Sequence, residues 1–296
     1  MVKRNYGKIL DRTFDVIVII IMIIVSLIII LPLLHILACS FSNAEAVYTG
    51  SVEFLPVGLT FENYIKVFNE PSIGRGYLNT IFYTFIGTVI GLILQLSAGY
   101  AFSRRDMRFR GFLTWVYVLT MFVSGGFIPT YLVIKNLNML NTIWAMIIPG
   151  CMSVYNIIII RTFMSSTVAW ELQEAAMLDG CGDIRMFFRI VLPLSAPVIG
   201  VMALYGIVGY WNSYFNALVY VTNSDLHPLQ MIMKKILVNN DMNSIGTGSL
   251  GEEEQALLAE ALKYTTIVVS SLPILIVYPF FQKFFQKGVM VGGLKG

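Results

Sequence analysis

The sequence predicts an all-α membrane protein with six transmembrane helices, and its composition is the first reason. Of the 296 residues, 57% are hydrophobic and only 12% are charged, and the mean hydropathy is +0.75. Soluble domains carry about 25% charged residues. A soluble chain of this length could not bury so much apolar surface, so lipid must surround most of it.

The positions of the charged residues give the second reason. Asp, Glu, Lys and Arg are absent from residues 16–44, 76–103, 111–134, 136–160, 190–224 and 264–282. A helix needs about 20 apolar residues to cross a bilayer, and a charge at its centre costs roughly 2.5–3.5 kcal/mol. The predicted spans form a single transmembrane domain over residues 1–296 and cover residues 14–37, 77–102, 112–133, 142–164, 194–222 and 264–285.

The basic residues predict that the N- and C-termini are both cytoplasmic. With this orientation, 14 of the 20 Lys and Arg residues lie inside, the side that normally carries their excess. The loop SRRDMRFR, residues 103–110, contributes most. The extracellular loops are then residues 39–76 and 223–262, and residues 165–193 form a cytoplasmic loop. We expect the first helix to remain as an anchor, because its apolar run is about twice the 7–15 residues of a signal-peptide core.

Glycines within the spans predict close helix contacts and bends. Gly87 and Gly91 form a G-x-x-x-G pair in the second span, which lets two helix backbones approach closely. Gly125 and Gly126, followed by Pro129, predict a bent or unwound backbone in the third span. Lipid tolerates such a backbone only where it faces protein or a cavity.

The cytoplasmic loop begins with a sequence that favours a helix, Trp170–Leu178. Leu172, Ala175 and Ala176 have the i, i+3, i+4 spacing of one apolar helix face. The two alanines on this face would let a partner approach closely. From the residues alone, a docking surface and an amphipathic hairpin lying on the membrane are about equally plausible.

A glycine turn and a second helix are predicted to follow. Gly180 and Gly182 permit the positive φ that ends a helix. Asp183 is expected to cap a second helix over residues 184–191, and Pro193 to end that helix and open the fifth span. Three large apolar side chains of this second helix are expected to project toward a partner: Met186, Phe187 and Phe188.

Residues 174–193 also contain the pattern E-A-A-x3-G-x9-I-x-L-P. This pattern resembles the EAA loop of the permease subunits of bacterial ABC importers, although Cys181 stands where another small residue is usual. The resemblance implies the type I ABC importer permease fold and a loop that seats in an ATP-binding subunit and transmits its closure. It assigns this coupling to Glu174, Ala175, Ala176, Asp179, Gly180, Leu192 and Pro193.

The C-terminal sequence is similar to the tail of MalG-type sugar permeases, in the branch serving oligosaccharide and uronide importers. The matching segments are YPFFQK at residues 278–283 and KGVMVGGLKG at residues 287–296, and Trp211-Asn212 belongs to the same pattern. The resemblance implies a tail that reaches between two ATPase subunits through Gly292, Gly293 and Lys295. Without the resemblance, a frayed basic terminus is the simpler interpretation.

The fifth span is the best candidate for lining a solute path. Tyr205, Gly209, Asn212 and Asn216 share one helical stripe, with aromatic residues beside it. Aromatic faces and amide groups suit a sugar, whereas the same residues could instead pack helices together. Both interpretations stay open for the predicted path residues Tyr205, Tyr210, Trp211, Asn212, Tyr214 and Asn216.

No enzymatic pattern is present in the sequence. It contains no Walker A, H-E-x-x-H or C-x-x-C motif, and its three cysteines lack the spacing of a metal site. We therefore expect no catalytic residue, no metal and no cofactor on this chain, with ATP and Mg bound by partner subunits. The resemblance implies four partners besides lipid, namely a MalF-type permease subunit, two ATP-binding subunits and an extracellular solute-binding protein, and no nucleic acid.

The predicted function is ATP-driven import of an oligosaccharide or related carbohydrate across the bacterial cytoplasmic membrane by alternating access. One alternative is an ABC permease for a non-sugar solute. Another is an ion-coupled secondary carrier, although such carriers usually show internal repeats or intramembrane charges. A third is a membrane sensor or scaffold that transports nothing. Co-purification with an ATPase and solute-dependent uptake would separate these possibilities.

Overall fold

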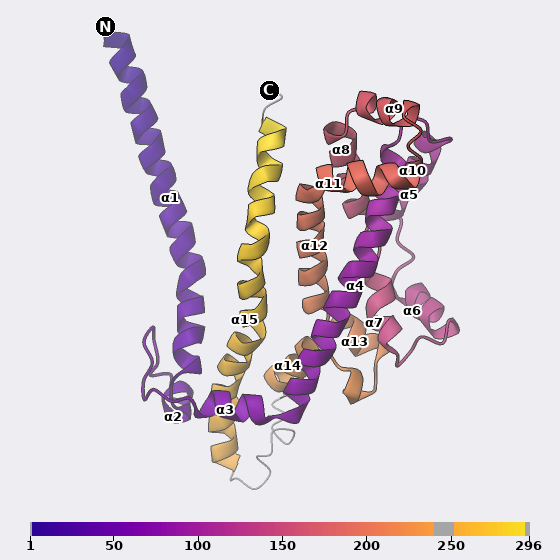
Figure 1. Cartoon of the computed structure of the whole chain (residues 1–296). Helices are drawn as coiled ribbons and strands as arrows, with labels where there is room; N and C mark the ends of the chain where they lie inside the picture. The colour runs from indigo at the N-terminus through magenta and orange to yellow at the C-terminus, as the bar shows by residue number, and fades with distance from the viewer. Residues whose placement is uncertain (1, 240–251, 294–296) are drawn as a thin grey trace. The chain divides into compact units, whose positions relative to one another are not determined.

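The computed structural model describes residues 2–239 and 252–293, which are helical and contain no strand within these ranges (Figure 1). In chain order the helices are α1 (Val2–Ser40), α2 (Ala44–Tyr48), α3 (Glu62–Asn69), α4 (Pro71–Ser103), α5 (Arg110–Phe122), α6 (Phe127–Asn136), α7 (Ile143–Ile147), η1 (Ile148–Gly150), α8 (Val154–Thr167), α9 (Trp170–Leu178), α10 (Asp183–Met186), η2 (Phe187–Val191), α11 (Leu192–Leu194), α12 (Ala196–Trp211), α13 (Phe215–Tyr220), η3 (Ser224–Leu226), α14 (Leu229–Asn239) and α15 (Glu252–Gly293).

Three continuous helical segments are long and apolar enough to cross a membrane: Thr13–Ser40, Pro71–Ser103 and Ala259–Gln282. Three further candidates are helix pairs bent at a short break, and the number of spans reaches six when each pair crosses as one. The bent pairs are Arg110–Phe122 with Phe127–Asn136 at 111°, Ile143–Gly150 with Val154–Thr167 at 46°, and Asp183–Leu194 with Ala196–Trp211 at 83°. The all-helical membrane fold is therefore confirmed.

The break predicted in the third span lies at the glycine pair. Gly126 has φ of +81°, a conformation that favours glycine, and α6 begins at the next residue. The fourth span was expected to be one helix but is interrupted after Gly150. The imide nitrogen of Pro149 cannot donate a hydrogen bond, and α8 starts again behind Ser153, whose Oγ accepts from the backbone N of Asn156 at 3.3 Å.

The fifth span was also predicted to be continuous, and this was wrong. The helix α12 ends at Trp211, and α13 begins only at Phe215. Asn212 caps the end of α12 with φ −88° and ψ 8°, and its side-chain amide donates to the carbonyl of Val208 at 3.0 Å. Asn forms such local bonds readily and is a weak helix former, which accounts for the interruption.

The last helix is longer than predicted at both ends. Instead of residues 264–285 it covers Glu252–Gly293, so the predicted extracellular loop 223–262 is partly helical through η3, α14 and the start of α15. Pro273 and Pro279 lie within α15 without ending it. The glycine-rich tip of the loop, residues 246–251, lies outside the described residues.

The chain divides into two compact units, the first formed by Met1–Glu70 with Lys235–Ser270 and the second by Pro71–Lys234 with Ser271–Gly296. In the first unit, the segment after α1 folds back on the end of that helix. The Nδ2 of Asn63 donates to the carbonyl of Ser42 at 3.0 Å, and the hydroxyl groups of Ser40 and Tyr64 lie 2.8 Å apart. Turns and short helices were predicted here and are confirmed by α2 and α3.

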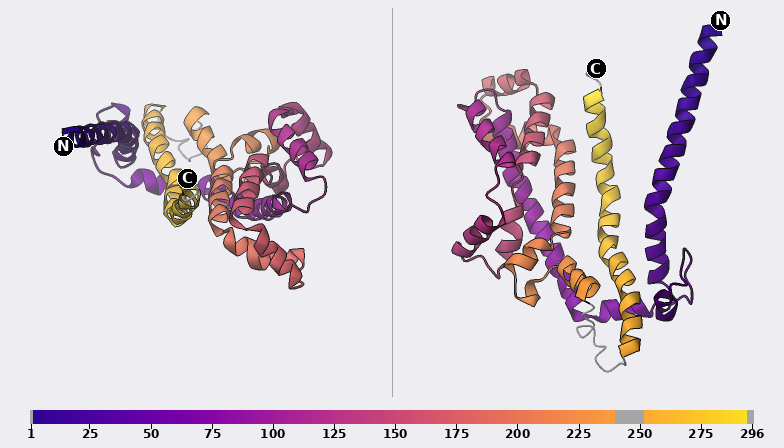
Figure 2. Two further views of the ribbon diagram at one scale, coloured as in Figure 1. Left: turned by 90° about the horizontal axis from the view of Figure 1, so that it is seen from above. Right: turned by 180° about the vertical axis from the view of Figure 1, so that it is seen from behind.

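In the second unit, α4 packs along α8 and α12 (Figures 1 and 2). The glycines of α4 are the points of closest approach. A Cβ at Gly87 would overlap the Tyr210 ring of α12, one at Gly99 would overlap Ile160 of α8, and one at Gly91 would lie 3.1 Å from the carbonyl oxygen of Cys151. The close contact predicted from the G-x-x-x-G pair is confirmed.

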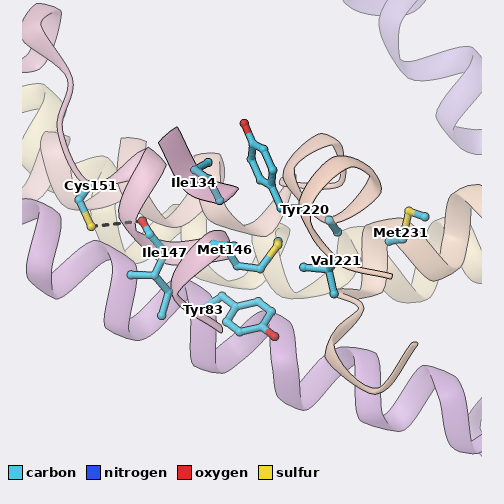
Figure 3. Close-up of a cluster of buried hydrophobic side chains, with 10 residues drawn as sticks. Tyr83, Ile134, Met146, Ile147, Cys151, Tyr220, Val221 and Met231 are labelled. Carbon is cyan, nitrogen blue, oxygen red and sulfur yellow. Dashed lines mark hydrogen bonds between the residues drawn. The ribbon is translucent and has the colours of Figure 1, made fainter. Parts of the chain in front are cut away.

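A buried apolar cluster lies toward the N-terminal half of α4, away from the α9–α10 end (Figure 3). Tyr83 from α4 meets Met146 and Ile147 from α7, with Tyr220 and Val221 at the end of α13. These side chains are all less than 9% exposed. The short helices α7, before the break in the fourth span, and α13, after the break in the fifth, are thus held by ordinary core packing.

The contact at Gly87 gives a stability prediction. Gly87→Ala should lower the unfolding free energy by about 1–3 kcal/mol, because the new Cβ would overlap the Tyr210 ring, whose hydroxyl is bonded to the carbonyl of Ile147. Gly74→Ala is the matched control on the same helix, since a Cβ there meets nothing within 4 Å. Thermal unfolding of the purified variants in detergent measures the difference. Equal melting temperatures for the two variants would contradict the prediction.

Candidate functional site

The segment of residues 165–193, called the elbow below, starts at the end of α8, continues through α9 and turns at Gly180. The backbone N of Cys181 donates to the carbonyl of Ala176 at 2.9 Å, and that of Gly180 donates to Met177 at 3.0 Å. This pair of bonds is the Schellman motif, which places the residue after the C-cap in the left-handed region. Gly180 fits that position with φ of +75°. The predicted helix Trp170–Leu178 and its glycine turn are therefore confirmed.

The second half of the elbow differs from the prediction in two details. Gly182 has φ of −70°, so only Gly180 supplies a positive φ. Asp183 does not cap the second helix but is its first residue, and its carboxylate lies 3.1 Å from the guanidinium of Arg104. The ion pair draws the Asp183 side chain away from the backbone groups that a cap would bind.

The two faces of α9 are differently covered. Gln173 and Ala176 are buried against the rest of the unit, while Leu172 and Ala175 point outward, so the predicted apolar face is split. Large apolar side chains nevertheless lie exposed on the elbow: Leu172 at 42%, Leu178 at 90%, Ile184 at 77% and Phe188 at 61%. Met186, predicted to project, is fully buried because it packs beneath Arg104.

Most residues assigned to coupling by the motif are accessible. Glu174, Ala175, Asp179, Gly180 and Pro193 are exposed, Leu192 is half-buried and Ala176 is buried. The Nε1 of Trp170 donates to the Glu174 carboxylate one turn later on α9. Apart from Pro193 in α11, the exposed members form an outward surface on the turn and on the first helix.

Arg104, just past the end of α4, connects that helix to both halves of the elbow. Its guanidinium contacts the Asp106 carboxylate at 2.5 Å as well as that of Asp183, and its Nη1 donates to the Sδ of Met186 at 3.3 Å. Its charge also lies 5.9 Å from the ring centre of Trp170. Arg104 is only 7% exposed. Its hydrogen bond lowers the pKa of Asp106, which keeps that carboxylate ionised.

A cavity of about 210 Å³ lies farther along α4, between this helix, α12 and the breaks in the fourth and fifth spans. Its lining is mostly small or polar: Gly87, Thr88, Gly91, Leu92, Gln95, Gly150, Asn156, Met202, Tyr205, Gly206, Gly209, Tyr210, Ser213 and Asn216. None of these lining residues carries a formal charge at neutral pH.

Two polar side chains beside the cavity bind carbonyls that the broken fourth span leaves free. The Tyr210 hydroxyl donates to Ile147 at 2.7 Å, and the Gln95 amide donates to Cys151 at 2.8 Å. The Asn156 amide in turn donates to Gln95 Oε1 at 3.1 Å. These bonds satisfy backbone groups for which lipid offers no partner. Thr88 Oγ1 has no hydrogen-bond partner among the described residues and lines the cavity.

The predicted path residues divide into two groups. Tyr205, Tyr210 and Asn216 line the cavity, and Gly209 of the same stripe lies with them. The other three do not line it in this conformation: Trp211 is buried, Asn212 caps α12, and Tyr214 packs under the ammonium group of Lys234 at 4.5 Å. Their part in a solute path stays a prediction.

Sequence reasoning missed Gln95, Asn156 and Arg104. Gln95 was visible as an amide inside an apolar span, on the helix stripe of Thr84, Thr88 and Gly91.

For the predicted ATPase-contacting tail, Gly292 and Gly293 are the last residues of α15, and Lys295 lies outside the described residues. The ATPase contact assigned to these three residues stays a prediction.

The second unit combines bent apolar spans around a polar cavity with a surface elbow at one end. These features define a multi-span membrane transport subunit. Comparison with known families supports this class. Residues 87–291 match the family described as "Binding-protein-dependent transport system inner membrane component". The chain therefore belongs to this family, and it is a permease of the ABC importer class in the inner membrane.

Two relatives in Bacillus subtilis (strain 168) match nearly the whole chain. "Polygalacturonan/rhamnogalacturonan transport system permease protein YtcP" is 36% identical over 97% of this chain and 99% of its own length. "Protein LplC" is 39% identical over 96% of each chain. A crystal structure of a bacterial ABC transporter involved in the import of the acidic polysaccharide alginate matches with a TM-score of 0.83, 31% identity and coverage of 93% of this chain and 97% of that one.

The contacts of Arg104 predict how firmly the elbow is held. Arg104→Gln removes a charged group that bonds two carboxylates, and such bonds contribute about 1.5–3 kcal/mol. Hydrogen exchange in α9 and α10 should therefore become roughly 10-fold to 100-fold faster. Arg108→Gln, an exposed arginine in the same loop, is the control and should leave exchange unchanged. Unaltered exchange in the Arg104 variant would show that the elbow is held in another way.

Proposed function

We propose that the chain is one half of the membrane pore of an ATP-driven importer for an oligosaccharide or related carbohydrate. In this proposal residues 1–296 form a single transmembrane domain with both termini in the cytoplasm. The elbow docks on an ATP-binding subunit, and the cavity beside α4 is part of the solute path. Alternating access results when closure of the ATPases moves the elbow.

The arrangement of α4 is the observation that carries the proposal. This helix of 33 residues ends at the elbow, where Arg104 bonds Asp183 of α10, and its middle lines the cavity through Gly87, Gly91 and Gln95. One unbroken helix thus touches both sites. A displacement of the elbow would act on the cavity without passing through a flexible loop.

The surface of the elbow has the character of a docking site. Leu178, Ile184 and Phe188 are exposed on the same segment as the exposed carboxylates of Glu174 and Asp179. Protein interfaces combine exposed apolar side chains with polar ones. The proposed partner at this surface is one of two ATP-binding subunits, which hold ATP and Mg and carry out the hydrolysis. A MalF-type permease subunit and an extracellular solute-binding protein complete the proposed assembly.

The cavity supports a carbohydrate as the solute. It places the aromatic rings of Tyr205 and Tyr210 near the side chains of Thr88, Ser213 and Asn216. Rings can cover the apolar faces of a sugar while hydroxyl and amide groups bond its hydroxyls, and a pocket of this mixed kind fixes ligand orientation. The polysaccharide and oligosaccharide transport systems named for the relatives point the same way.

Coupling is tested at the two glycines of the turn. Gly180→Leu should abolish solute-stimulated ATP hydrolysis by the assembled importer, because a side chain at φ of +75° costs roughly 1–2 kcal/mol and shifts the turn. Gly182→Leu is the matched control, since its φ is −70° and a Cβ meets nothing within 4 Å. ATPase assays in proteoliposomes compare the two. Full stimulation of the Gly180 variant would refute the coupling role.

The solute path is tested by filling the cavity. Gly209 lines it, and a Cβ there meets no atom within 4 Å, so Gly209→Phe should fold but occupy the space. Uptake of radiolabelled oligosaccharide into proteoliposomes should fall at least about tenfold, with assembly of the complex retained on size-exclusion chromatography. Gly74→Phe, at an open position of α4 outside the cavity lining, should transport normally. Normal uptake by the Gly209 variant would remove this cavity from the path.

A further inference from the structure

A second cavity, of about 200 Å³, lies behind the elbow and has no part in the function proposed above. It is lined by residues from the end of α4, the start of α5, the end of α8 and the first turn of α9. Two arginines, Arg105 and Arg110, line it together with polar side chains. The complete lining is Ser103, Arg105, Arg110, Ser165, Val168, Trp170 and Gln173.

The two arginines beside this cavity differ from Arg104 in their partners. Neither Arg105 nor Arg110 pairs with a carboxylate among the residues that the structure describes. Arg105 instead lies over the Trp170 ring, 5.8 Å from its centre. Arg161 of α8 is near enough for its charge and that of Arg110 to repel each other. By contrast, Arg104 in the same turn has two acidic partners.

Two polar atoms at the cavity lack the partners that buried groups normally have. The Nε of Arg110 is a buried donor, and the Oε1 of Gln173 is a buried acceptor; neither makes a hydrogen bond within the described residues. Gln173 is only 5% exposed, and its Nε2 already donates to Val168 at 3.3 Å. A ligand that satisfies both atoms must carry an acceptor for Arg110 and a donor for Gln173.

The cavity also lies at a defined depth. Ser103 is the last residue of α4, and Ser165 belongs to the last turn of α8, so the cavity is level with the ends of two spanning segments. Lipid headgroups occupy this depth in a bilayer, and basic pockets between spanning helices bind anionic headgroups. Arginine is suited to phosphate because it offers several donors in a planar fork.

We propose that this cavity binds a glycerophosphate group, with phosphatidylglycerol as the lipid that supplies it. The phosphate oxygens accept hydrogen bonds from Arg105 and Arg110. A glycerol hydroxyl donates to Oε1 of Gln173, which accounts for both unpartnered atoms. The bound headgroup lies against Trp170 and Gln173 and so supports the inner face of α9 from the membrane side.

The test measures lipid binding to the purified full-length chain and needs no transport activity. The delipidated protein is titrated with short-chain phosphatidylglycerol, and binding is followed by native mass spectrometry and by the rise in melting temperature. Short-chain phosphatidylcholine serves as the zwitterionic comparison. We expect phosphatidylglycerol to bind at least about tenfold more tightly to the wild type. Equal affinity for the two lipids would overturn the proposal.

Variants locate the binding. Arg105→Gln combined with Arg110→Gln should reduce phosphatidylglycerol affinity at least about tenfold, whereas Arg108→Gln should keep it, since that exposed arginine lies in the same loop but outside the cavity lining. Gln173→Glu keeps the shape of the side chain and adds an internal anion, so it should weaken binding similarly. Equal losses in the double variant and in Arg108→Gln, or full binding by Gln173→Glu, would refute the site.

Inorganic phosphate distinguishes the source of the ligand. If millimolar phosphate displaces phosphatidylglycerol from the wild type but has no effect on the double variant, the site recognises phosphate itself and a free anion can fill it. If phosphate does not compete, the lipid's hydroxyl and chains are required and the membrane is the source. A lowered lipid affinity at higher salt is expected in both cases, because the contacts are ionic.

Discussion

The contact of α4 with α8 and α12 is the constraint on which the second unit depends. A Cβ at Gly87 or Gly99 would overlap a side chain of the neighbouring helix, and one at Gly91 would crowd the Cys151 carbonyl, so the glycines set how closely the helices approach. Close packing of this kind replaces the hydrophobic effect, which cannot drive helices together in lipid. It also brings the Tyr210 ring against α4 and within reach of the carbonyl of Ile147, where the fourth span is broken.

Each break in a spanning helix leaves backbone carbonyls without helical partners, which is unfavourable in lipid. Side chains that also line the cavity bind such carbonyls at the break in the fourth span. Carbonyls released by the break after Gly150 are bonded by Tyr210 and Gln95. An unsatisfied backbone group in hydrocarbon costs several kcal/mol, so these polar residues would be needed even if no solute passed. The packing and path interpretations of the fifth span are therefore compatible: Tyr210 holds the break, while Tyr205 and Asn216 face open space.

Part of this architecture could be predicted from local patterns. Charge-free runs predicted apolar spanning segments, and the structure has three continuous helices and three bent helix pairs that are apolar enough to cross a membrane. Trp170–Leu178 with Gly180 defined the first helix and turn of the elbow. The predictions that were wrong or missed concern contacts between residues far apart in the sequence, or a side chain that bonds its own helix.

Asp183 was assigned to a helix cap because nothing nearby in the sequence shows that Arg104, far earlier in the chain, binds its carboxylate. The end of α12 at Trp211 depends on an Asn side chain bonding its own helix, which an apolar run conceals. Gln95 and Asn156 lie on different helices, so their pairing appears only in the fold.

Two routes connect the elbow to the cavity, and they differ in stiffness. Along the chain, the route runs through the π-helical turn η2 and the 83° bend before α12, both of which interrupt regular helical hydrogen bonding. Through space, it crosses from Asp183 to Arg104 and enters α4, which is unbroken as far as the cavity. A helix with complete internal hydrogen bonds moves as a rigid element, whereas a bend absorbs displacement. Motion of the elbow would thus reach the cavity chiefly through α4. A buried arginine holding carboxylates and thioethers suits that junction, because the ionic contacts are strong and the weak, polarisable sulfur contacts adapt to small changes in angle.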